Sequence, residues 1–156
     1  NIKKGSNYFP FLYYNMKQQL IRPFHLAFPI KNIEETRNWY TNILGCSVGR
    51  ESERWIDFNF FGHQISAHLS EQSDMPVHNE VDNHQVPARH FGIILTPSDW
   101  KTLSKRLANN GAEFVIKPYT RFKGEKGEQS TLFIKDPSGN CLEFKSFKSD
   151  KMIFAN

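Results

Sequence analysis

The sequence predicts an α+β fold built from two successive modules, each with the element order βαβββ. Alternating apolar residues mark short strands, and one helical pattern follows the first strand of each module. The order also repeats, because His25 and His90 stand at equivalent points of the two modules. A repeat of this length indicates a duplicated module, since solenoid repeats are shorter.

The first module is expected to begin with a strand over 24–30. Asn32 is a good helix N-cap and Glu35 completes a capping-box pattern, while Gly45 supplies the C-terminal stop. A stripe at helical spacing marks the buried face of this helix: Ile33, Trp39, Tyr40, Ile43 and Leu44. The three remaining strands of the module are predicted over 47–51, 55–61 and 64–70.

Residues 71–87 are polar and show no period, which predicts a linker of the length typical of functional lids or module connectors. The second module then repeats the order. Thr96 precedes a helix with Pro97 at its first position, and Asn110-Gly111 ends it. Strands are predicted over 90–95, 113–122, 130–135 and 141–147.

The expected organisation is one domain over 23–147, with module one at 23–70, the linker at 71–87 and module two at 88–147. An N-terminal extension precedes it over 1–22. Met16 could be an internal start, which would make 1–15 an extension or a cloning remnant. A tail follows over 148–156, and its apolar residues are expected to dock on the body: Met152, Ile153 and Phe154.

Composition narrows the class of partner. The chain of 156 residues has 20 Lys and Arg against 16 Asp and Glu, and its net charge of +4 is scattered. This pattern favours a small molecule, an anionic one included, over nucleic acid. Two cysteines outside any Cys-x-x-Cys pair predict a reduced, cytoplasmic protein. No run approaches the 18 apolar residues of a membrane span, so no membrane is expected.

The alternation sorts side chains onto two faces. Phe24, Leu26 and Phe28 would pack beneath the helices with the apolar residues of the other strands. The opposite faces form a polar, concave front that carries His25, Gln64, Ser66, His68, His90 and Glu143. A mid-strand carboxylate such as Glu143 needs water, a cation or a metal to compensate its burial.

Each candidate residue also has an ordinary structural interpretation. A lone histidine on a strand is usually structural, but two at equivalent positions, with a carboxylate on the same side, favour a metal. Tyr119, Arg121 and Lys123 alternate along the sixth strand, where they either contact an anionic substrate or form a solvated rim. Gln64 and Gln129 have the same two interpretations. The other histidines are expected to face solvent: His63, His78 and His84.

Two motifs carry a family resemblance. One ends the first helix, Trp39-Tyr40-x-x-x-Leu44-Gly45, and the other is Asp136-Pro-x-Gly-Asn-x-x-Glu143-Phe144. With the paired modules, they make the chain from about Phe24 to Phe147 resemble the vicinal oxygen chelate superfamily, which includes glyoxalase I, bleomycin-resistance proteins and extradiol dioxygenases. The resemblance implies a curved mixed-sheet cup with helices outside. Its implied metal ligands are His25, His90 and Glu143.

The sequence departs from two of the family's patterns. Ser66 stands where glyoxalase I has a glutamate ligand, so it is assigned to substrate binding. The remaining two histidines and carboxylate are similar to the extradiol dioxygenase triad, a set suited to Fe(II). Those dioxygenases usually add an acid/base histidine after the sixth strand, where residues 127–130 offer none. His68 is the candidate substitute, beside Glu143.

The resemblance therefore predicts a metal-dependent enzyme, a dioxygenase or a glyoxalase-like lyase or isomerase, acting on a small molecule with vicinal oxygens. Fe2+ is the favoured cofactor, with Zn2+, Ni2+, Co2+ or Mn2+ as alternatives. One alternative is a metal-free binding protein of the bleomycin-resistance kind, and another is a scaffold with a vestigial site. Homodimers are common in the family, and the sequence itself does not require one.

Overall fold

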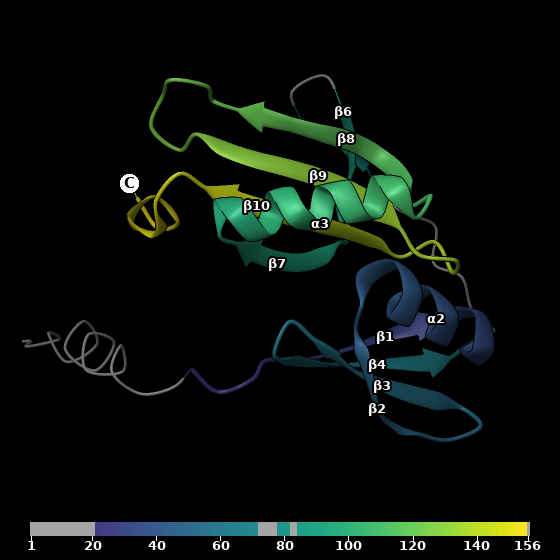
Figure 1. The fold of residues 1–156 in the computed structure, drawn as a ribbon. Coiled ribbons are helices and arrows are strands. Elements are labelled where there is room, and N and C mark those ends of the chain that lie inside the picture. Colours follow the sequence, from purple (N-terminus) through teal and green to yellow (C-terminus); the bar gives the residue numbers. More distant parts are fainter. Residues whose placement is uncertain (1–20, 72–77, 82–83, 156) are drawn as a thin grey trace, which may run out of the picture.

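Two four-stranded mixed sheets carry the fold in the computed structural model, which describes residues 21–71, 78–81 and 84–155 (Figure 1). The first sheet has the strand order β1-β4-β3-β2, from His25–Ile30, His63–Leu69, Trp55–Phe60 and Ser47–Glu51. The second has the order β7-β10-β9-β8, from Phe91–Leu95, Cys141–Phe147, Gln129–Lys135 and Glu113–Arg121. The predicted pair of βαβββ modules is confirmed, and the two sheets stay separate.

The sheets have the same internal plan. The first strand of each module pairs in parallel with the last, β1 with β4 and β7 with β10, and the remaining pairs are antiparallel. A parallel pair needs a crossover connection. In the first module this includes α2 (Ile33–Trp39), continued by a π-helical turn, η1 (Tyr40–Leu44), and in the second α3 (Pro97–Asn109). Both helices pack on the apolar faces of their sheets, and α3 lies across the strands of the second sheet (Figure 1).

The helix ends follow the sequence signals. The side chain of Asn32 accepts a hydrogen bond from the backbone N–H of Glu35, and Thr96 caps α3 in the same way through Asp99. Gly45 ends η1 with φ at 81°, a left-handed conformation that glycine adopts without strain. The capping residues thus correctly indicated where both helices begin.

One apolar core joins the two modules. Tyr40 is fully buried at its centre, stacked on Phe58 with ring centroids 4.8 Å apart. Phe28 of β1 lies against Phe91 of β7, with centroids 5.1 Å apart, and Phe60 contacts both Phe91 and Phe144. The predicted apolar face is therefore confirmed, except at its first member.

Phe24 is the exception, because its side chain is 61% exposed. It precedes β1, and its backbone N–H donates to Nδ1 of His63 while its ring meets the His63 ring edge-on. At the other end of the chain, Met152 and Ile153 are half-buried, but Phe154 is 80% exposed, so its predicted docking is wrong. Phe24 precedes the first residue of β1 and Phe154 follows the last helical turn, so neither lies within a strand whose alternation would place it in the core.

The Asp136–Asn140 turn ties the modules together. Asp136 is buried and its carboxylate accepts from the backbone N–H groups of Ser138 and Asn140 and from the hydroxyl of Tyr40. Ser138 in turn accepts from the N–H of Lys31, and the Asn140 amide donates to the carbonyl of Pro29. The motif that carries the family resemblance therefore has a structural role at the junction of the modules.

The linker prediction over 71–87 is wrong in part. Residues 72–77 and 82–83 lie outside the described residues, but β5 (His78–Val81) pairs with β6 (His84–Pro87) as an antiparallel hairpin. These four-residue strands are too short and too polar to show a hydrophobic period. β6 lies on the face of the second sheet opposite α3 (Figure 1), where Val86 packs against a small cluster of Ile116, Phe133 and Cys141.

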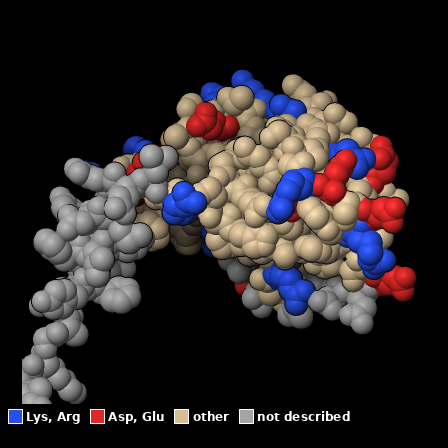
Figure 2. All heavy atoms as spheres, turned by 90° about the horizontal axis from the view of Figure 1, so that it is seen from below, with Lys and Arg blue, Asp and Glu red and all other residues tan. Residues whose placement is uncertain are grey.

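The surface is mixed in charge. On the face seen in Figure 2, side chains of both signs are interspersed around a broad area of uncharged residues. Within the described residues, no helix is long and apolar enough to cross a membrane.

Candidate metal and substrate site

Glu143 lies at the centre of the second sheet, on β10 between β7 and β9. Its register partner on β7 is Gly92, and a Cβ at that position would collide with the backbone carbonyl of Glu143. The glycine therefore allows the two strands to approach. The carboxylate is only 6% exposed, and its Oε1 accepts a hydrogen bond of 2.7 Å from the hydroxyl of the fully buried Thr131.

Two cationic groups face the other carboxylate oxygen. Nε2 of His90 lies 3.1 Å from Oε2 of Glu143, and Nζ of Lys145 lies 3.2 Å from the same atom. Lys145 and Thr131 are cross-strand partners on the same face of the sheet as Glu143. Both of these residues were missed by the sequence analysis, although the alternation that singled out Glu143 also places Lys145 beside it.

The ring of His90 is held in one orientation. Its Nδ1 lies 2.7 Å from the carbonyl oxygen of Pro87, at the end of β6, and its edge meets the ring of Phe133. Both partners accept, so Nδ1 donates to the carbonyl of Pro87 and Nε2 donates to Glu143, and the ring then carries both protons. This is the arrangement by which metal-binding histidines are usually oriented.

The pair is electrostatically coupled. The hydrogen bond to Glu143 raises the pKa of His90, and this outweighs the opposing effect of burial. Burial by itself raises the pKa of Glu143, but hydrogen bonds from His90 and Thr131 and the charge of Lys145 together lower it. The carboxylate is therefore ionised at neutral pH and favours a cation at Oε2.

His25 does not reach this cluster within one chain. It is the first residue of β1, exposed, and opposite Gln64. On β1 it is Phe28, three residues after His25, that packs against Phe91, the neighbour of His90. Three residues of a strand span about 10 Å, so His25 lies well away from this contact. Among the described residues, no group of three His, Cys, Asp or Glu side chains is close enough to hold a metal. The structure thus brings together two of the three predicted metal ligands.

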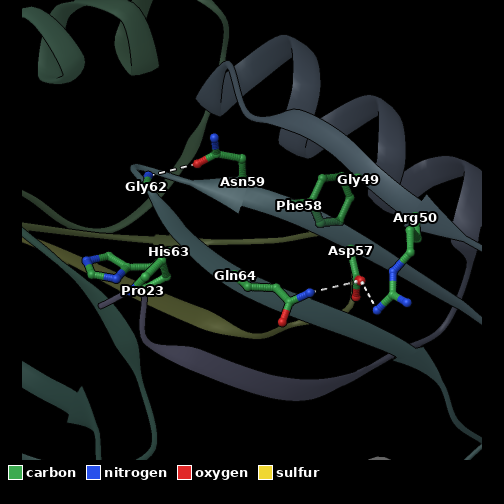
Figure 3. Close-up of a pocket in the computed structure, with 9 residues that line it drawn as sticks. All are labelled: Pro23, Gly49, Arg50, Asp57, Phe58, Asn59, Gly62, His63 and Gln64. Atoms are coloured by element: carbon green, nitrogen blue, oxygen red, sulfur yellow. Dashed lines mark hydrogen bonds and ion pairs between the residues drawn. The ribbon is translucent and has the colours of Figure 1, made fainter. Parts of the chain in front are cut away.

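The first sheet has its own buried carboxylate. Asp57 on β3 is 4% exposed and accepts hydrogen bonds from the Ser66 hydroxyl at 2.5 Å and the Gln64 amide at 3.2 Å. Arg50 approaches Asp57 to 3.6 Å from the surface. Asp57, Gln64 and Arg50 border a cavity of about 320 Å³ that reaches His63 (Figure 3). Sequence reasoning missed Asp57, although a carboxylate alternating with Ile56 and Phe58 gives the same signal as Glu143.

The other predicted site residues divide between the two sheets. Gln64, Ser66 and the exposed His68 alternate along β4 on the face that carries His25, with His68 opposite Trp55. On the second sheet, Tyr119 is opposite Thr131 and Arg121 is opposite Gln129, so these three predicted residues share the face of Glu143. Lys123 lies beyond the end of β8 and is exposed.

Comparison with known proteins agrees with this architecture. Residues 22–144 match the family model of the Glyoxalase/Bleomycin resistance protein/Dioxygenase superfamily. The chain belongs to this superfamily. It is 35% identical to a glyoxalase/bleomycin resistance protein/dioxygenase from Alicyclobacillus acidocaldarius, whose crystal structure superposes with a TM-score of 0.72 over 85% of this chain and 96% of that one.

More distant solved structures share the fold. A genomically encoded fosfomycin resistance protein from Listeria monocytogenes is 12% identical, with a TM-score of 0.64 over 86% of this chain and 100% of that one. An integron cassette protein from the mobile metagenome of Halifax Harbour sewage outfall is 23% identical, with a TM-score of 0.61 over 82% and 100% of the two chains. The superfamily includes metal-dependent enzymes and binding proteins, so the family alone leaves the activity open.

Proposed function

We propose that the protein is a divalent-metal-dependent enzyme acting on a small molecule with vicinal oxygens. The main support is the contact between His90 Nε2 and Glu143 Oε2, in which the histidine is oriented by the carbonyl of Pro87. Membership of the superfamily supports the same class of site. The donor set of imidazole and carboxylate suits Fe2+, the favoured metal, and also Zn2+, Ni2+, Co2+ or Mn2+.

The metal would be held by His90, Glu143 and His25. His25 is exposed and does not meet the other two in one chain, so we propose that a second copy of the chain supplies it in a homodimer. Such a site has three protein ligands and leaves positions open for substrate.

When bound, the metal supplies a Lewis acid and a template for two neighbouring oxygens, and with iron it supports an extradiol-dioxygenase-like reaction. The residues of the chain have separate proposed roles. Glu143 and His68 are the candidates for moving a proton. Substrate would be bound by groups from both modules: Gln64, Ser66, Tyr119, Arg121, Lys123 and Gln129.

One observation favours a second candidate function, a metal-free binding protein. The Glu143 carboxylate already has Thr131, His90 and Lys145 as partners, so its burial is compensated without a metal. The cavity beside Asp57 would then be part of the ligand-binding surface.

Metal analysis separates the two. Protein purified without metal-chelating resin is compared with His90→Ala and with a control, His78→Ala, which changes an exposed histidine outside the cluster. Near-stoichiometric metal that is lost only in His90→Ala supports the enzyme. Iron would direct assays to catechols and oxygen uptake, and zinc, nickel or cobalt to isomerase or lyase reactions. If all three proteins stay free of metal after reconstitution, the binding protein is the better conclusion.

Mixing variants tests the source of His25. Neither His25→Ala nor His90→Ala should bind metal by itself. If each site takes His25 from one copy and His90 with Glu143 from the other, a mixed dimer of the two variants regains one complete site. If all three ligands come from one chain, mixing restores none.

A further inference from the structure

Lys145 occupies the oxygen that a metal would need. Its Nζ lies 3.2 Å from Oε2 of Glu143, the atom that also faces Nε2 of His90 at 3.1 Å. Glu143 is 6% exposed and nearly fixed, whereas the Lys145 side chain is 32% exposed on a flexible stem. The ammonium of Lys145 therefore has room to move away from the carboxylate, whereas the carboxylate of Glu143 is held in place by its burial.

The ammonium and a divalent metal cannot share this oxygen without strong repulsion. A metal binds a carboxylate oxygen at roughly 2.0–2.2 Å. An ammonium still in contact with the same oxygen would then be within a few ångströms of two further positive charges, in a site that excludes much of the water. Lys145 therefore has to leave Glu143 when a metal binds.

The residues beside Lys145 indicate what its ammonium group could bind after it leaves Glu143. On its own face Lys145 is opposite Thr131 on β9, and Thr131 is opposite Tyr119 on β8. Arg121 is two residues beyond Tyr119, on the face that both residues share. A Lys145 side chain released from Glu143 would lie on the sheet face that also carries the phenol of Tyr119 and the guanidinium of Arg121, which are groups that bind negatively charged oxygens.

We propose that Lys145 is a competing cation that yields Glu143 to the metal and then binds an anionic oxygen of the substrate. Resting on the proposed metal-dependent function, this inference adds a substrate class: chelating molecules that carry a negative charge next to their paired oxygens. It also makes opposite predictions for the affinity of the metal and that of the substrate.

Metal affinity is the first measurement. Metal-free wild type, Lys145→Gln and Lys145→Arg are titrated with Zn2+ against a chromophoric chelator. Lys148→Gln is the control, since it removes an equal charge at an exposed residue just after β10. Loss of the competing charge should tighten Zn2+ binding by roughly tenfold in Lys145→Gln. The arginine variant keeps the charge and should show no gain, and the control should match wild type.

Anion binding is the second. Oxalate, a small anion with vicinal oxygens, is titrated into the Zn2+-loaded proteins by calorimetry. It should bind Lys145→Gln roughly tenfold more weakly than wild type, and the difference should shrink as salt rises. The Lys148→Gln control should again match wild type.

The opposite signs distinguish this role from a structural one. A variant whose sheet is damaged would lose affinity for both Zn2+ and oxalate, and that result overturns the inference. Equal Zn2+ affinity in wild type and Lys145→Gln, with oxalate binding unchanged, overturns it while leaving the metal-dependent function intact. Absence of Zn2+ binding in the wild type and in every variant overturns both the role of Lys145 and the metal-dependent function.

Discussion

Thr131→Val tests how the buried Glu143 carboxylate is stabilised. Valine has nearly the shape of threonine but lacks the hydroxyl that donates to Glu143 Oε1 at 2.7 Å. Thr131 is fully buried and Glu143 is 6% exposed, so water has little access to replace the lost donor. The change removes one hydrogen bond to a charge and leaves the packing almost unaltered.

The expected cost follows from that geometry. Hydrogen bonds to charged groups contribute about 1.5–3 kcal/mol, and here the acceptor is left without that donor, so we expect a loss of about 2 kcal/mol in the free energy of unfolding. For a chain of this size the melting temperature should fall by about 6 °C. In urea the midpoint should fall by about 1 M.

The loss should depend on pH. The pKa of Glu143 in the folded protein is below its ordinary value of 4.5, because the bonds from His90 and Thr131 and the charge of Lys145 outweigh the opposing effect of burial. A carboxylate with a lowered pKa stabilises the fold above its unfolded pKa, and the contribution is lost as pH falls through the folded value. The difference between wild type and variant should thus be large at pH 7 and smaller near pH 3.

Urea denaturation of the metal-free proteins, followed by circular dichroism at both pH values, makes the measurement. Thr131→Ser is the control, because it keeps the hydroxyl and removes only a methyl group. A Thr131→Val loss that is the same at pH 7 and pH 3, or matched by Thr131→Ser at both, would refute the reasoning, since packing alone would then explain it.

Two further predictions concern packing. Gly92→Ala should destabilise the protein severely, by about 3 kcal/mol or more, because its Cβ would collide with the backbone carbonyl of Glu143. Gly62→Ala, where only the positive φ is strained, should cost about 1 kcal/mol, and equal effects in thermal melts would contradict the collision. Burial raises the pKa of both thiols, Cys46 and Cys141, to about 12. At pH 8 they should react slowly with a disulfide reagent until the protein is unfolded, and fast reaction in native conditions would contradict this burial.

The sequence by itself determined the modules. Strand alternation and helix capping are local signals, so they predicted the βαβββ order, the Asn32 and Thr96 caps and the face that carries Glu143. It failed where local signals are weak. The hairpin β5–β6 has strands too short to show a period, and Phe24 precedes the strand that would have turned it inward.

The composition of the site was decided by the tertiary structure. Which side chains meet depends on the register between strands and on the packing of one module against the other, and neither is encoded in the spacing of residues. Register placed Thr131 and Lys145 on the Glu143 carboxylate, and the contact of Phe28 with Phe91 kept His25 away from it. The sequence thus gives the faces of the strands, whereas the distances between functional groups arise only when the sheets are formed and packed.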